Sequence, residues 1–288
     1  MKLALIGVGL IGGSFARAAL AAGEVSAVIG FDADTGALST ALDLGAITAA
    51  AASPEAAVKQ ADLVMLAVPV GAMRSVMRTI APHLHADALV TDVGSTKADV
   101  VAAARAELGA AFPRFVPGHP IAGRETHGVQ SSRPQLFEGK LFITTPVSET
   151  NEGAVVRIER LWQRLGCRVE RMDPNEHDRV FAAVSHLPHL LAFALVARIA
   201  REDDAERKLA KAGAGFRDFT RIAASSPTMW RDVCMANRDA LSAELAGYRA
   251  LLDELQGALD ASDADTLEAV FSAAAECRRT HAPRLDGD

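Results

Sequence analysis

The stretch Gly7-Val8-Gly9-Leu10-Ile11-Gly12 constrains the fold more than any other part of the chain. An apolar run, Lys2–Ile6, precedes it, and small and apolar residues follow at helical spacing over Ile11–Ala22. In such a strand–turn–helix unit the first glycine makes the turn, the second lets the backbone approach a pyrophosphate, and the third lets the helix pack on the strand. The sequence therefore predicts a dinucleotide site at Gly7, Gly9, Leu10, Ile11 and Gly12, with phosphates at the amino end of the helix.

A carboxylate stands where such a site needs one. A second strand candidate, Ala27–Phe31, ends in Asp32, twenty residues beyond Gly12. This position accepts hydrogen bonds from an adenosine ribose and repels a 2′-phosphate, and Ala33 and Asp34 follow it instead of an arginine. We therefore expect NAD rather than NADP as the cofactor. A solvated turn aspartate is the alternative interpretation.

Strands and helices continue to alternate through the first half of the chain. Apolar strand candidates occur at residues 62–69, 88–92, 114–116, 140–145 and 167–172, with a helix at 152–165. This alternation predicts an α/β fold, a doubly wound Rossmann sheet whose ligands bind at the carboxyl ends of its strands. Both VGSTK, residues 93–97, and PGHPIAGRE, residues 117–125, follow such strands.

The second of these segments has the composition of a catalytic loop. Pro117 and Pro120 restrict the backbone, whereas Gly118 and Gly123 allow it to approach a ligand closely. His119 is the residue in this segment whose proton exchanges near neutral pH. We interpret the segment as a loop that holds a catalytic histidine, with a simple turn as the alternative.

From Asp173-Pro174 onward the pattern is helical only, with helices predicted at 176–200, 203–212, 228–255 and 265–279. We therefore predict a Rossmann domain over residues 1–173 and an all-α substrate-binding domain over residues 174–288. Helices that are apolar on more than one face favour a homodimer built through this second domain.

Two histidines of the second half, His186 and His189, lie three residues apart on one helix face. A metal site needs further ligands, and only His177 is near in the sequence, so we predict no metal. Two histidines of the core, or a His189 that faces the substrate where Pro188 bends the helix, are the remaining interpretations.

Residues 213–232 are predicted to be irregular, and they carry three arginines in an acidic protein. A guanidinium pairs well with a carboxylate, so an anionic substrate is expected to bind here, with surface ion pairing as the alternative. The arginines are Arg217, Arg221 and Arg231.

Composition excludes several classes of protein. A chain of 288 residues that is 50% hydrophobic is typical of a soluble globular protein, and a net charge of −6 without basic runs argues against nucleic-acid binding. Three separated cysteines favour a reducing cytoplasm. The glycines and Arg17 interrupt the amino-terminal apolar run, which argues against a signal peptide, and the apolar stretch Leu187–Ala200 is too short to cross a membrane.

Six motifs in order resemble the prephenate dehydrogenase family, which includes arogenate and cyclohexadienyl dehydrogenases. They are GVGLIGGS near the start, DVGSTK at 92–97, GHPIAGRE at 118–125, LFEGK at 136–140, VSHLPH at 184–189 and GFRDFTRIAASSPTMWRD at 215–232. The resemblance implies an NAD(P)-dependent oxidative decarboxylation of prephenate to 4-hydroxyphenylpyruvate, a step of tyrosine biosynthesis that needs no metal.

The resemblance also implies roles for individual residues. His119 matches the base that accepts the substrate hydroxyl proton, and Ser95 matches a residue that orients it. Arg221 matches the arginine that binds the side-chain carboxylate. His189, Trp230 and Glu125 match further residues around the substrate pocket, Glu125 as a gate.

Three alternatives remain open from the sequence. The nearest alternative concerns the substrate, which is arogenate, alone or together with prephenate. Another two-domain hydroxyacid dehydrogenase or imine reductase would lack the HPIAG histidine and the DFTRIA arginine. A catalytically silent dinucleotide-binding regulator would bind NAD without turnover. We expect a monofunctional enzyme.

Overall fold

Six parallel strands form the main sheet, in the order β3-β2-β1-β4-β5-β6. The computed structural model describes residues 1–123 and 126–285. The strands are β1 (Lys2–Ile6), β2 (Ala27–Phe31), β3 (Ala49–Ala50), β4 (Leu63–Leu66), β5 (Leu89–Asp92) and β6 (Phe115–Val116). The order reverses between β1 and β4, as in a Rossmann sheet, which confirms the predicted α/β fold.

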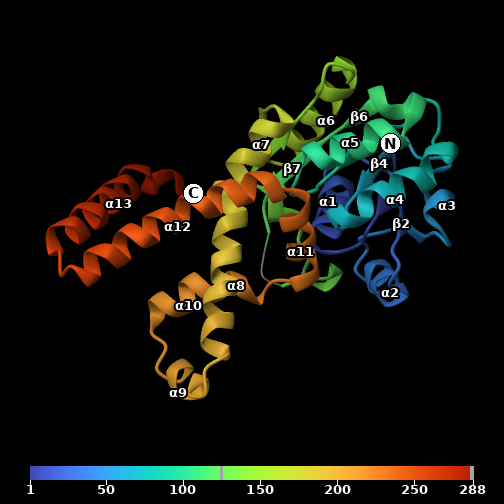
Figure 1. The fold of residues 1–288 in the computed structure, drawn as a ribbon. Helices are drawn as coiled ribbons and strands as arrows, with labels where there is room; N and C mark the ends of the chain where they lie inside the picture. The colour runs from blue at the N-terminus through green and yellow to red at the C-terminus, as the bar shows by residue number, and fades with distance from the viewer. Residues whose placement is uncertain (124–125, 286–288) are drawn as a thin grey trace. The chain divides into compact units, whose positions relative to one another are not determined.

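Helices cover both faces of this sheet because its strands are apolar on both faces. Leu3 and Leu5 of β1 join one core, and the alternate residues Ala4 and Ile6 join another. The first core is closed by α1 (Leu10–Ala21), α2 (Thr35–Asp43) and α6 (Glu152–Arg164). The second is closed by α3 (Pro54–Val58), α4 (Val70–Ile80) and α5 (Ala98–Glu107), of which α4 and α5 lie side by side (Figure 1).

A second, three-stranded sheet follows, made of β7 (Gly118–Ile121), β8 (Leu141–Thr144) and β9 (Arg168–Arg171). β7 runs antiparallel to β8, and β9 runs parallel to it. The expectation that residues 140–145 and 167–172 extend the main sheet was therefore wrong, and His119 lies on a strand instead of a loop. Gly118 permits this pairing because a Cβ there would lie 2.3 Å from the Phe142 ring. Pro120 is tolerated because β7 is an edge strand.

Every regular element after Asp173 in the described chain is helical, as predicted. These elements are α7 (Pro174–Phe181), the π-helical turn η5 (Ala182–His186), α8 (Leu187–Ala200), α9 (Ala205–Leu209), α10 (Ala214–Thr220), the 3₁₀ turn η6 (Arg221–Ala224), α11 (Pro227–Ala236), α12 (Arg238–Asp260) and α13 (Ala264–Leu285). Residues 213–232, predicted to be irregular, are mostly helical. The helix predicted over 228–255 is interrupted at Asn237, whose side chain is held by hydrogen bonds described below.

Four further 3₁₀ turns lie in the described part of the chain before Asp173. They are η1 (Ala81–His83), η2 (Gly109–Arg114), η3 (Val129–Ser131) and η4 (Pro134–Phe137). Of these, η3 and η4 pack on α1 and so extend the first core.

The segments α7, η5 and α8 form one continuous helix from Pro174 to Ala200. Pro188 falls immediately after the wide π turn, where the regular helical hydrogen-bond ladder is already interrupted, so its missing N–H does not end the helix. This helix has 27 residues and contains a window with a mean hydropathy of 1.9, enough by length and composition to cross a membrane. The sequence predicted a helix over residues 176–200, and the observed helix begins two residues earlier, at Pro174.

The chain divides into two compact units, Met1–Arg238 and Asp239–Asp288. The first unit contains both sheets and the helices through α11, and in it α7 packs on α5 and α11 packs on α4. The second unit contains α12 and α13. The domain division at residue 173 rests on the change of pattern and stays a prediction.

Candidate active site

The glycine turn after β1 has the geometry of a phosphate-binding loop. Gly7 has a φ of +96°, and a Cβ on it would lie 2.4 Å from the carbonyl oxygen of Ala67. A Cβ on Gly12 would lie 2.2 Å from the carbonyl oxygen of Gly7, so the third glycine permits the close contact of α1 with the turn. A Cβ on Gly9 would meet nothing within 4 Å among the described residues. The second glycine therefore faces open space, as a bound pyrophosphate requires.

The residues around this loop also fit a dinucleotide. Asp32 lies directly after β2, and its Oδ2 accepts a hydrogen bond from the N–H of Val8 in the loop at 2.8 Å. Its Oδ1 accepts one from the N–H of Asp34 at 2.9 Å. Leu10 and Ile11 lie in the first turn of α1. Among the described residues, no side chain caps the amino end of this helix. Backbone N–H groups at this end are available to phosphate oxygens.

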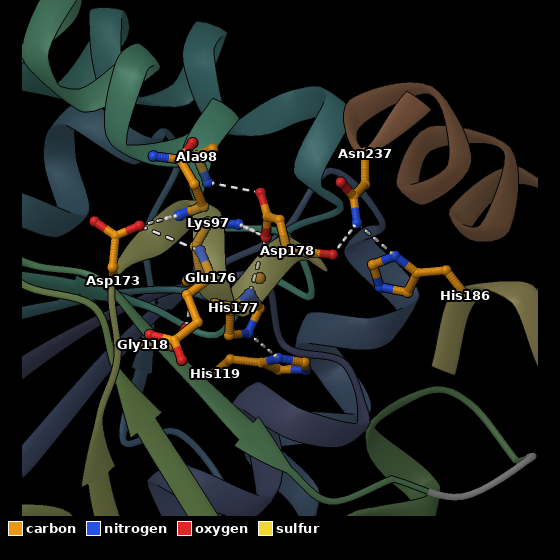
Figure 2. Close-up of polar contacts among 12 residues, drawn as sticks. Lys97, Ala98, Gly118, His119, Asp173, Glu176, His177, Asp178, His186 and Asn237 are labelled. Carbon is orange, nitrogen blue, oxygen red and sulfur yellow. Dashed lines mark hydrogen bonds and ion pairs between the residues drawn. The ribbon is translucent and has the colours of Figure 1, made fainter. Parts of the chain in front are cut away.

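His119 heads a chain of three hydrogen-bonded side chains (Figure 2). Its Nδ1 lies 2.9 Å from Nε2 of His177, and Nδ1 of His177 lies 2.8 Å from Oδ1 of Asp178. His119 is partly buried on β7, whereas His177 and Asp178 are buried on α7. The chain of contacts therefore runs from two buried side chains to a histidine that retains exposed surface.

Asp178 is held by the amino end of α5. The backbone N–H of Lys97 donates to Oδ1 at 2.8 Å, and that of Ala98 donates to Oδ2 at 2.9 Å. The side-chain amide of Asn237 donates to the carbonyl oxygen of Asp178 at 2.7 Å and lies 3.0 Å from Nδ1 of His186 (Figure 2). The carboxylate therefore joins α7 to the segment that follows β5, and these bonds also explain the helix break at Asn237.

A buried ion pair fixes the backbone next to His119. The ammonium of Lys97 pairs with Asp92 and donates to the carbonyl oxygen of Gly118 at 2.7 Å. Asp92 in turn accepts from the N–H of Gly118 at 3.1 Å through Oδ1. Because both charged side chains are fully buried, the pair ties the end of β5 to the start of β7 without solvent screening.

Burial favours the neutral form of His119, His177 and His186. Burial lowers the pKa of His119 well below its usual value, and the nearby His177, Lys97 and His186 lower it further. Burial likewise lowers the pKa of His177, and it lowers that of His186 to about 4. Burial opposes ionisation of Asp178, but hydrogen bonds from His177 and the two backbone N–H groups outweigh it and lower the pKa of the carboxyl. A neutral His119 is a base.

His189 and Trp230 form a stacked pair on α8 and α11. Their ring centroids are 3.6 Å apart, with 20° between the planes. Nδ1 of His189 lies 2.9 Å from the carbonyl oxygen of Ser185, which leaves Nε2 of the neutral ring as an acceptor. The indole N–H of Trp230 is buried without a hydrogen-bond partner among the described residues. Together the two rings offer one acceptor and one donor to a ligand.

Three further residues were predicted for the site: Ser95, Arg221 and Glu125. Ser95 is partly buried in the turn between β5 and α5. Among the described residues, the side chain that His119 hydrogen-bonds is His177, and the orienting role of Ser95 stays a prediction. Arg221 is exposed at the start of η6, which packs on α8. Glu125 lies outside the described residues. Within the described residues, no group of three or more His, Cys, Asp or Glu side chains is arranged so that it could hold a metal ion.

Sequence reasoning missed the positions of His177, Asp178 and Lys97. His177 entered only as a metal-ligand candidate, and Lys97 only as the end of the DVGSTK motif. A signal was present, because an acidic residue directly follows His177 at the first turn of a helix that begins with Asp173-Pro174. Nothing in the local sequence indicates that this pair meets β7.

The glycine turn follows β1, and His119 lies on β7, which continues the chain after β6. Both therefore lie at the carboxyl edge of the main sheet, since its strands are parallel. That combination defines the class of dinucleotide-dependent oxidoreductases. Two family models narrow the class, one described as the nucleotide-binding domain of prephenate dehydrogenase over residues 15–171, the other as its dimerization domain over residues 173–273. The chain belongs to the prephenate dehydrogenase family.

Individual relatives agree with this assignment. A prephenate dehydrogenase of Bacillus subtilis is 35% identical over 95% of this chain and 74% of its own length. A cyclohexadienyl dehydrogenase of Zymomonas mobilis is 35% identical over 96% of this chain and 94% of its own length. The structure of prephenate dehydrogenase from Aquifex aeolicus in complex with hydroxyphenyl propionate and NAD⁺ is 36% identical, with a TM-score of 0.88 over 97% of this chain and 98% of that one.

Proposed function

We propose that this protein is an NAD-dependent dehydrogenase that oxidatively decarboxylates prephenate to 4-hydroxyphenylpyruvate. The observation that carries the proposal is His119, a partly buried base with one ring nitrogen already hydrogen-bonded, on the strand after β6. The relatives named above support the substrate, and the Aquifex aeolicus complex supports the cofactor, because it contains NAD⁺ and a hydroxyphenyl acid.

The proposed reaction uses His119 as a general base. NAD, when bound, supplies the acceptor of the hydride that leaves the ring carbon bearing the hydroxyl group. His119 accepts the proton of that hydroxyl as the carbon–oxygen double bond forms. Loss of the ring carboxylate as carbon dioxide then aromatises the ring, and the ring oxygen takes the proton back from His119. The base is thereby restored, and carbon dioxide, 4-hydroxyphenylpyruvate and NADH are the products.

The other side chains would bind the substrate. We assign the side-chain carboxylate to Arg221, and we assign to Ser95 a hydrogen bond to the substrate hydroxyl and the orientation of His119. The rest of the pocket is assigned to His189, Trp230 and Glu125. Trp230 supports this assignment, because its indole N–H, unpartnered among the described residues, is a donor suited to a polar ligand atom. Glu125 enters on the family resemblance alone.

The preference for NAD over NADP rests on Asp32. Its two carboxylate oxygens accept hydrogen bonds from backbone N–H groups of the loop and of Asp34, so the negative charge is fixed next to the glycine turn. A 2′-phosphate would be repelled there. We propose the binding residues Gly7, Gly9, Leu10, Ile11, Gly12 and Asp32.

We further propose a cytoplasmic homodimer that dimerises through residues 174–288 and binds neither nucleic acid nor membrane. The description of the second family model as a dimerization domain supports the homodimer. The same model begins at residue 173, which supports a domain division at that point.

The test is NADH formation at 340 nm with purified protein. Prephenate and arogenate are offered side by side, each with NAD and with NADP, and His119→Asn is the matched control. We expect turnover of prephenate with NAD and a loss on the order of 100-fold or more in the variant. Turnover of arogenate alone would change the pathway step, an outcome that the cyclohexadienyl dehydrogenase relative makes worth testing. Absence of NADH with both substrates would contradict the proposal.

A further inference from the structure

We infer that His177 and Asp178 are positioning residues that fix the tautomer of His119, with its proton on Nδ1 and its lone pair on Nε2. The inference deepens the proposed function, because it assigns the nitrogen that acts as the base. It rests on the hydrogen bonds that join His119, His177 and Asp178 in series, and on the backbone N–H groups that hold Asp178 (Figure 2).

The backbone contacts of Asp178 determine which group donates and which accepts in the hydrogen bonds that lead to His119. Two backbone N–H groups, of Lys97 and Ala98, donate to its two carboxylate oxygens, and a peptide N–H cannot reverse its role. A carboxylate with such partners is ionised and accepts hydrogen bonds only. Its remaining contact, at 2.8 Å, therefore takes the proton on Nδ1 of His177.

The next bond follows from the neutrality of His177. A neutral imidazole with its proton on Nδ1 has a lone pair on Nε2, so this nitrogen accepts. Nδ1 of His119 lies 2.9 Å away and must donate to it. The free nitrogen of His119 is then Nε2, and a neutral His119 offers a lone pair there to the substrate hydroxyl.

The charged groups around His177 agree with its neutrality. Asp178 and Asp92 favour the charged ring, whereas burial and the ammonium of Lys97 disfavour it, and the balance lowers its pKa. His119 faces the same ammonium and has no carboxylate as a direct partner among the described residues. Both rings are thus uncharged at neutral pH.

Packing holds the two rings in this arrangement. Phe181 stacks on His177 with centroids 4.4 Å apart, and it contacts His119 with centroids 4.9 Å apart. A ring flip of His119 would place a carbon where Nδ1 now meets His177. His177 and Asp178 therefore fix both the orientation and the protonation of His119, as the buried aspartate does for the histidine of a serine-protease triad.

The direct test is the tautomer itself, which needs no substrate. Protein labelled with ¹⁵N-histidine is examined at pH 7.5 by two-bond ¹H–¹⁵N correlation, with His119→Asn and His177→Gln assigning the resonances. We expect His119 to give a protonated Nδ1 and an unprotonated Nε2. A His119 protonated on Nε2 would overturn the inference whatever the protein catalyses.

The kinetic test compares two substitutions of His177. The glutamine of His177→Gln can still accept a hydrogen bond from His119, whereas the phenylalanine of His177→Phe fills the space without an acceptor. We expect His177→Phe to lower kcat on the order of 100-fold with little change in the KM for NAD, and His177→Gln to recover most of that loss. Met77→Ala, a core change in α4, controls for lost stability: it should lower the melting temperature and leave kcat unchanged.

Each outcome bears on one claim. Equal kcat values in His177→Phe and the parent would overturn the positioning role. A loss in Met77→Ala as large as that in His177→Phe would assign the effect to stability and overturn it as well. Failure of the parent protein to turn over prephenate or arogenate would contradict the proposed function, and the tautomer measurement would still decide the inference.

Discussion

At the scale of single residues, Lys97 shows how a charge inside this protein is maintained. Its ammonium is fully buried between Asp92 and the carbonyl oxygen of Gly118, and removal of either charge leaves the other without its partner in the interior. The desolvation cost of an unpaired buried charge then falls on the folded state alone.

Lys97→Met should therefore lower the free energy of unfolding by about 3–5 kcal/mol. Urea denaturation followed by circular dichroism measures this loss. Lys59→Met, a change at an exposed helix end, is the matched control and should stay within about 0.5 kcal/mol of the parent. A loss in Lys97→Met no larger than in the control would mean that water or a rearranged side chain compensates Asp92.

At the scale of helices and strands, local sequence predicted what depends on local pattern. The run Lys2–Ile6 and the glycines after it carry the pattern of β1 and α1 within one short stretch of sequence. Residues 140–145 are equally a strand in either sheet, because their pattern does not show which strand they pair with. Their place beside β7 depends on the contact of Phe142 with Gly118, 24 residues earlier.

The second and third glycines of the loop differ in what surrounds them, and this gives a test of the nucleotide site. Gly9→Ala adds a methyl group to open space and keeps an extended backbone with a φ of −77°, so the melting temperature should not change. Its methyl group would occupy the place of the pyrophosphate, so NADH affinity should fall about tenfold or more.

Gly12→Ala should affect both quantities. Its Cβ would lie 2.2 Å from the carbonyl oxygen of Gly7, so the turn must shift, and the melting temperature should fall together with NADH affinity. Fluorescence titration with NADH and thermal melting of both variants separate the two effects. Unchanged NADH affinity in Gly9→Ala would place the dinucleotide elsewhere.

At the scale of the whole chain, the motifs indicated the base but not what holds it. Lys97, Asp178 and Asn237 are far apart in the sequence, and their hydrogen bonds arise only when the end of β5, α7 and the end of α11 meet. Asn237 lies within a stretch whose periodicity continues smoothly into the next helix, so the pattern predicted one helix. The helix is interrupted at Asn237 because its buried side chain would otherwise be left without hydrogen-bond partners.

The same assembly makes the stability of the protein depend on pH. Burial lowers the pKa values of His119, His177, His186 and His189 in the folded chain. Below a pH of about 6.5 the unfolded chain binds protons on these rings that the folded chain does not, so the free energy of unfolding falls as the pH decreases. For the fully buried His186, whose pKa is lowered to about 4, the loss is complete near pH 4 and amounts to about 3 kcal/mol.

Thermal melting between pH 7.5 and 4.5 tests this expectation. The melting temperature of the parent should be nearly constant above pH 7 and should fall steadily below pH 6.5. His186→Leu should melt at a lower temperature at pH 7, because Asn237 loses its contact with His186 and keeps only the one with Asp178. Its melting temperature should depend less steeply on pH below 6.5. Parallel pH profiles for the two proteins would show that His186 takes up its proton equally in the folded and unfolded states, and would remove it from the acid response of the fold.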